Sequence, residues 1–155
     1  MYRFVMSLSR QVKRQILLLI DISLVPVALL IALALQYNGL PDGSSLARNW
    51  LAVPLLMGIC ALLSTFMGLH KVQLKAYESH AIGLTAIHAI LLGLATVVLD
   101  DMAGYGTSFA TFINFALVYF LLSVATRMGM LQTLLLIYRS GQEQTRVLIY
   151  GAGPT

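Results

Sequence analysis

Four long apolar runs constrain this chain most, because each has the length of a helix that crosses a lipid bilayer. A bilayer core takes about 20 apolar residues in a helix, and the runs cover residues 16–37, 50–69, 81–99 and 109–127. Of the 155 residues, 59% are hydrophobic and 10% are charged, whereas soluble domains carry about 25% charged residues. The sequence therefore predicts an all-α membrane protein built as a four-helix transmembrane bundle.

The first two segments each admit two interpretations. Residues 1–15 hold four basic side chains, which fit a short basic amphipathic helix on the cytoplasmic membrane surface or a tail that only supplies topology charges. The run 16–37 is either an uncleaved anchor or the apolar part of a cleavable signal peptide. We favour the anchor, because 22 residues is long for a signal peptide and because Asp21 lies inside the run.

The apolar character of the last run continues past Arg127 to Tyr138, which leaves two arrangements open. One is a single long helix, and the other is a span over 109–127 followed by a surface helix to residue 139. About 30 helical residues would measure about 45 Å and overshoot a bilayer core of about 30 Å. We therefore expect the chain to leave the core near Arg127.

Basic residues predict the orientation of the spans, since cytoplasmic segments of membrane proteins are rich in Lys and Arg. Residues 1–15, 70–80 and 127–146 hold nine of the ten Lys and Arg, and the loops 38–49 and 100–108 hold the tenth. Four spans would then place both termini in the cytoplasm.

Among the polar residues within the runs, we single out four as functional candidates: Asp21, His88, Asn114 and Arg127. We expect Asp21 to be an interfacial carboxylate paired with a nearby basic residue or a headgroup; the alternative is the coupling carboxylate of a small exporter. His88 is expected to be neutral and hydrogen-bonded to a neighbouring helix, and Asn114 to join two helices. Arg127 is expected to extend its guanidinium to lipid phosphates.

Small residues form stripes on two predicted helices, and small faces let helices approach closely. The stripe on 81–99 contains Ala86, Ala89, Gly93 and Thr96, and a shorter one on 50–69 contains Ser64 and Gly68. Packing inside the bundle is the simpler interpretation. A homo-oligomer formed through the transmembrane helices is the alternative.

Several kinds of site are disfavoured. Cys60 stands alone in an apolar run, so no disulfide is expected. The three histidines lack the spacing of metal ligands, so no metal site is expected. The basic residues flank apolar runs without forming a continuous face, which indicates the lipid bilayer and not nucleic acid as partner. No tyrosine is followed four residues later by lysine, so the catalytic pair of short-chain dehydrogenases is missing.

The last ten residues, Arg-Val-Leu-Ile-Tyr-Gly-Ala-Gly-Pro-Thr, carry the one motif with a chemical meaning. A β-prone run that ends in Gly-x-Gly is how the first strand and turn of a dinucleotide-binding Rossmann domain begin. Gly151 would permit the tight turn, and Gly153 would let the backbone approach a pyrophosphate. The third glycine of the motif has no place before Thr155. Residues 140–155 are therefore expected to be a linker and the first strand of a truncated NAD(P)-binding domain; an ordinary strand with a glycine turn is the alternative.

With its basic start, Asp21 in the first span, four spans and Arg146 to Gly153, the chain resembles the N-terminal membrane-anchor region of a known family. These are the CapD-like membrane-bound nucleotide-sugar 4,6-dehydratases and epimerases of bacterial polysaccharide biosynthesis. The resemblance implies a multi-pass protein of the bacterial inner membrane.

In the full-length parent, the resemblance implies a cytoplasmic domain with bound NAD or NADP that acts on a UDP-N-acetylhexosamine. The cofactor oxidises C4 of the sugar, water leaves across C5–C6, and hydride returns to C6. Gly151 and Gly153 would be cofactor-binding residues of an incomplete motif. The catalytic residues have no counterpart here, so this chain alone is expected to hold no cofactor and to catalyse no reaction.

Two other functions stay open. Polyprenyl-phosphate sugar-1-phosphate transferases also begin with four spans and a Rossmann-like domain that opens with Gly-x-Gly. A self-contained four-helix transporter is the third hypothesis, and it would leave Gly151 and Gly153 unexplained.

Overall fold

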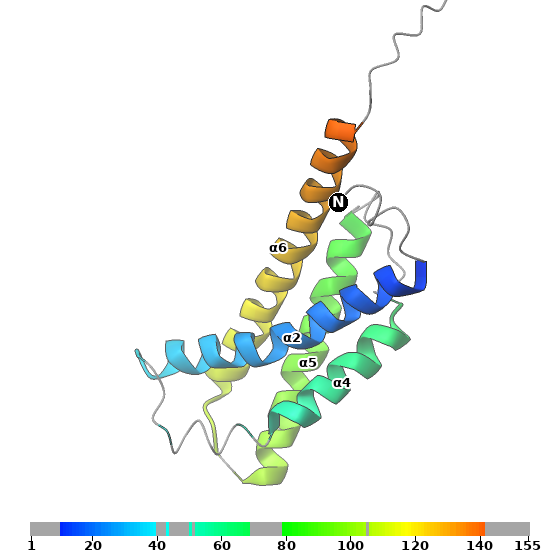
Figure 1. Ribbon diagram of the computed structural model, residues 1–155. Coiled ribbons are helices and arrows are strands. Elements are labelled where there is room, and N and C mark those ends of the chain that lie inside the picture. The colour runs from blue at the N-terminus through cyan, green and yellow to red at the C-terminus, as the bar shows by residue number, and fades with distance from the viewer. Residues whose placement is uncertain are drawn as a thin grey trace, which may run out of the picture.

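A computed structural model of the chain describes residues 10–39, 43, 50, 52–68, 79–104 and 106–141. The elements in this part of the chain are helices, and no strand occurs in it (Figure 1): α2 (Arg10–Gln36), α4 (Ala52–Phe66), α5 (Ser79–Ala103) and α6 (Phe109–Gly141). The all-α prediction is thus confirmed for the described residues. The predicted strand and the two cofactor-binding glycines, Gly151 and Gly153, lie outside them.

Three of these helices are long and apolar enough to cross a membrane. Their candidate spans are Gln15–Gln36, Ala81–Ala103 and Phe109–Thr133. The remaining helix, α4, is apolar but has only 15 residues, which corresponds to about 22 Å of helix against a bilayer core of about 30 Å. Three of the four predicted spans are therefore helices of membrane length and apolar composition, whereas the described part of α4 is shorter than predicted.

The four helices form a closed ring. Within it, α2 packs against α4 and α6, and α5 packs against the same two helices from the opposite side. Because α2 and α6 are the first and last helices of the described chain, their contact closes the bundle. Figure 1 shows α2 crossing in front of α5 and α6, with α4 beside it.

The bundle has an apolar interior and an apolar outside. Its core consists of small and aromatic side chains from all four helices: Val25, Ala28, Ala32, Leu56, Cys60, Ala89, Leu92, Phe115 and Tyr119. Many large hydrophobic side chains point outward, among them Leu62, Ile90 and Leu121. An outer surface of this kind suits lipid, since soluble proteins rarely expose large continuous apolar patches.

The position where α4 ends shows that the predicted small-residue stripe of Ser64 and Gly68 is wrong. The helix α4 ends at Phe66, and Gly68 follows in the left-handed conformation with φ of 67° and its N–H directed at the Thr65 carbonyl oxygen, 3.3 Å away. Glycine adopts this conformation without steric cost, which is why it ends many helices. Gly68 is therefore not part of a helix-packing stripe with Ser64.

Hydrogen bonds hold together the two ends of the connection between α5 and α6. Whereas the sequence predicted a loop from residue 100, α5 continues to Ala103. The Asp100 carboxylate accepts a hydrogen bond from the Thr107 backbone N–H at 2.9 Å and another from the Thr107 hydroxyl. The end of α5 is thus fixed to the residues that lead into α6.

The last helix continues without interruption through Arg127 to Gly141. The preferred prediction, a span that ends near Arg127 and a separate surface helix, is wrong for the backbone, and the alternative of one long helix is what the structure has. The proline in α2 has no larger effect, since that helix also continues through Pro26.

Candidate functional site

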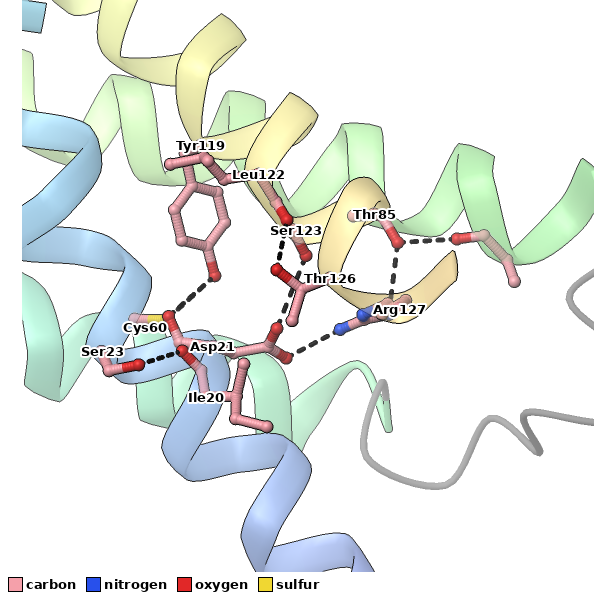
Figure 2. A network of polar contacts seen from close by, with 11 residues as sticks. Ile20, Asp21, Ser23, Cys60, Thr85, Tyr119, Leu122, Ser123, Thr126 and Arg127 are labelled. Carbon is pink, nitrogen blue, oxygen red and sulfur yellow. Dashed lines mark hydrogen bonds and ion pairs between the residues drawn. The ribbon is translucent and has the colours of Figure 1, made fainter. Parts of the chain in front are cut away.

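The buried face of α6 carries a row of residues spaced four apart: Thr111, Phe115, Tyr119, Ser123 and Arg127. Residues four apart lie above one another on one helix face. The C-terminal half of this row is polar, and it meets buried polar side chains from the other three helices. We call the set Asp21, Cys60, Thr85, His88, Tyr119, Ser123 and Arg127 the polar cluster. Figure 2 labels all of its members except His88.

An ion pair between α2 and α6 is the centre of the polar cluster. The Arg127 Nη2 atom lies 2.7 Å from Asp21 Oδ2, and the two side chains are 6% and 5% exposed. The second guanidinium nitrogen, Nη1, donates to Thr85 Oγ1 at 3.3 Å, and Ser123 Oγ donates to the other Asp21 oxygen at 3.5 Å. Thr85 in turn donates its hydroxyl proton to the Ala81 carbonyl oxygen at 2.8 Å.

Cys60 and Tyr119 extend the cluster to α4. The thiol sulfur and the phenol oxygen lie 3.3 Å apart, and the Tyr119 hydroxyl donates to the Asp21 main-chain oxygen at 3.4 Å. Figure 2 shows the Tyr119 side chain pointing down from α6 toward the backbone of α2 beside Asp21. The His88 ring meets the Tyr119 ring edge to face, with centroids 5.7 Å apart. Each of the four helices therefore contributes to the cluster.

The predictions for the two charged residues are wrong. Asp21 is not an interfacial carboxylate held by a sequence neighbour, because its partner is Arg127, 106 residues away. Arg127 does not extend to lipid phosphates, because its side chain is buried against α2 and α5. The physical reason is the same for both: inside an apolar bundle, each charge is best satisfied by the other.

The other two polar candidates, His88 and Asn114, lie in different surroundings. His88 is fully buried and its ring packs against Tyr119 of α6, but the predicted hydrogen bond to a neighbouring helix is not formed, since neither ring nitrogen has a hydrogen-bond partner among the described residues. Asn114 is half-buried on α6 and is not a member of the polar cluster. The structure brings Asp21, His88 and Arg127 together and leaves Asn114 outside.

Sequence reasoning missed Thr85, Tyr119 and Ser123 and considered Cys60 only as a cysteine without a disulfide partner. Cys60 is buried, and its thiol contacts the Tyr119 hydroxyl. The available signal was the spacing of Tyr119, Ser123 and Arg127 on one face of a single helix. That pattern marks a polar stripe, but the sequence does not say which helix faces it.

The small-residue stripe on α5 packs inside the bundle at its centre. Ala89 is buried, and a side chain added at Gly93 would place its Cβ 3.0 Å from the Ala116 Cβ of α6. The backbones of α5 and α6 thus approach closely at Gly93, which supports the simpler of the two interpretations.

The cluster's geometry favours structure over catalysis. Its two charges neutralise each other, and the exposed fractions of both side chains are small. The described residues contain no group of three His, Cys, Asp or Glu side chains placed to hold a metal ion. The arrangement can fix the mutual positions of four helices, because a buried ion pair with directional hydrogen bonds tolerates few alternative packings.

Comparison with protein-family models, with curated proteins and with solved structures gave no match.

Proposed function

We propose that this chain is the membrane anchor of a nucleotide-sugar 4,6-dehydratase or epimerase of bacterial polysaccharide biosynthesis. The observation that carries the proposal is the placement of the Rossmann-like motif: α6 ends at Gly141, and the run that leads to Gly151 and Gly153 begins at Arg146. The candidate span on α6 ends at Thr133, so eight further helical residues would carry the chain about 12 Å beyond it. An anchor that projects a helix in this way would hold a catalytic domain close to the membrane.

The buried ion pair favours an anchor over the transporter hypothesis. A coupling carboxylate must exchange protons or ions as it works, whereas the Asp21 carboxylate is engaged by Arg127 and Ser123 in the interior. The same pair closes the ring of helices, which is what a passive scaffold requires. If Asp21→Asn abolished transport of a solute in vesicles while the bundle stayed folded, the transporter hypothesis would replace the anchor.

The depth of the polar cluster supports the proposal that α4 also crosses the membrane. Asp21 lies six residues after the start of its candidate span at Gln15, and Arg127 lies six residues before the end of its span at Thr133. Cys60 lies six residues before Phe66, the end of α4. Because these side chains meet, α2 begins on the side of the bundle where α4 and α6 end. Alternating directions of this kind fit four passes with both termini in the cytoplasm.

Topology is testable by labelling single cysteines in a Cys60→Ala background with a membrane-impermeant maleimide. Cysteines replacing Gly43 and Gly104 should react from the periplasmic side, and cysteines replacing Gln73 and Gln142 should react from the cytoplasmic side. A periplasmic signal at Gln142 would overturn the anchor proposal, because nucleotide cofactors are cytoplasmic.

The choice between dehydratase and transferase depends on the coding sequence that follows the Thr155 codon in its gene. A Tyr-x-x-x-Lys motif downstream would support the dehydratase, because that pair transfers the proton in short-chain dehydrogenases. A fifth hydrophobic segment there would instead support the sugar-phosphate transferase and contradict the proposal.

A further inference from the structure

The helix α6 is longer than a bilayer requires. It has 33 residues, which measure about 50 Å, whereas the core of a bilayer is about 30 Å thick. Its candidate span alone, Phe109–Thr133, has 25 residues, and about 20 would suffice. The helix can therefore sit at more than one depth.

Two depths are compatible with the sequence of α6. In the shallow position, the charge-free run 109–126 crosses the core and Arg127 reaches the phosphate layer. In the deep position, the span extends to Thr133 and Arg127 lies six residues inside it. An isolated helix would favour the shallow position, because a guanidinium in hydrocarbon is unfavourable and is drawn to the interface.

In the structure, the two terminal nitrogens of Arg127 are held by protein groups and not by the surroundings of the bundle. They contact Asp21 of α2 at 2.7 Å and Thr85 of α5 at 3.3 Å, and the side chain is 6% exposed. The third nitrogen, Nε, is buried without a hydrogen-bond partner among the described residues. Asp21 and Thr85 lie six and four residues inside their own candidate spans, which start at Gln15 and Ala81. Contact with them therefore places Arg127 inside the span of α6, as in the deep position.

We propose that the Asp21–Arg127 ion pair sets the depth of α6 in the membrane, and that loss of the Asp21 charge, which leaves Arg127 unpaired, lets α6 move outward toward the cytoplasm. The inference rests on the proposed membrane anchor. The expected movement is the six residues between Arg127 and Thr133, or about 9 Å along the helix. Because residues 142–155 follow α6 directly, the pair also sets how far the Rossmann-like motif stands from the membrane surface.

Labelling along α6 tests this proposal. Single cysteines replacing Met128, Gln132 and Leu136, all exposed on the outer face of the bundle, are introduced into the Cys60→Ala chain. A membrane-impermeant maleimide is applied to inside-out vesicles. With the ion pair intact, Leu136→Cys should react and the cysteines at 128 and 132 should be protected. In Asp21→Asn, the cysteines at 132 and 128 should react as fast as the one at 136, so the boundary moves by about one to two helical turns.

Two double variants distinguish a change in the depth of α6 from general destabilisation of the bundle. Exchange of the charges, Asp21→Arg with Arg127→Asp, should restore protection at 132, because the pair is rebuilt in reverse. Removal of both charges, Asp21→Leu with Arg127→Leu, should also keep 132 protected, because no charge is drawn outward. Ser123→Ala removes only the 3.5 Å contact and should leave the boundary unchanged.

The proposal is wrong if the boundary in Asp21→Asn equals that of the parent, or if the uncharged double variant exposes position 132 equally. Synthesis in a cell-free system with added vesicles gives the boundary even for variants that do not accumulate in cells. Cysteines replacing Leu117 and Leu121 report on the anchor itself, since both positions lie deep in the span and face outward. Labelling there would overturn the membrane anchor, whereas an unmoved boundary at 132 overturns only the depth proposal.

Discussion

A carboxylate and a guanidinium inside an apolar bundle are each unfavourable alone and tolerable together. The 2.7 Å contact between Asp21 and Arg127 is made where both side chains are almost fully buried. Removing one partner of such a pair leaves an uncompensated charge, which typically costs about 3–5 kcal/mol, whereas replacing both with apolar residues is often neutral. The pair therefore acts as a unit.

Stability in detergent should show this unit directly. We expect Asp21→Leu and Arg127→Leu each to lower the free energy of unfolding by about 3 kcal/mol or more. The double variant should lose much less than the sum of the two, because no unpaired charge remains. Thermal unfolding of the four proteins gives the comparison, and losses that simply add would show that the two residues do not act on each other.

At the scale of the helices, the backbones of α5 and α6 approach each other closely at Gly93. Among the described glycines, this is the one where an added side chain would have the least room. A Cβ at this position would lie 3.0 Å from the Ala116 Cβ and 3.5 Å from the Phe112 carbonyl oxygen. By contrast, Gly83 on the same helix is exposed and has open space around it. Substitutions at these two glycines therefore distinguish the effect of packing between helices from the effect of helix propensity.

We expect Gly93→Leu to destabilise the bundle by about 1–3 kcal/mol, because added bulk forces the two backbones apart. Gly83→Ala should be neutral or stabilising by up to about 1 kcal/mol, because alanine favours helix more than glycine. Both changes are measured by thermal unfolding in detergent. An unchanged melting temperature for Gly93→Leu would show that α5 and α6 separate without cost.

At the scale of the whole molecule, the bundle and the motif that follows it are expected to have separate tasks. A dinucleotide site needs the helix that follows the glycine-rich turn, since its N-terminal N–H groups and dipole hold the pyrophosphate. In residues 1–155, only Pro154 and Thr155 follow Gly153. We therefore predict that a polypeptide of these residues, purified alone, does not bind NAD or NADP; saturable binding in calorimetry would contradict the anchor and imply a site among the helices.

The sequence predicted the helices far better than their contacts. Apolar runs of membrane length locate α2, α5 and α6, because burial in lipid requires that length and composition whatever the neighbours are. The role of Arg127 could not be predicted in the same way. A charge near the end of an apolar run usually marks the interface, and only the arrival of Asp21 from another helix makes burial favourable.

The ion pair between α2 and α6, which closes the ring of helices, can form only late in the synthesis of the chain. Among the described helices, Asp21 belongs to the first to be synthesised and Arg127 to the last, and the two residues are 106 positions apart. At a synthesis rate of about 5–20 residues per second, the carboxylate waits about 5–20 seconds for its guanidinium. During that interval it must stay near the membrane surface or contact another group. A nascent chain that stalls before Arg127 would leave Asp21 without this partner, so the four-helix bundle is complete only once α6 has been made.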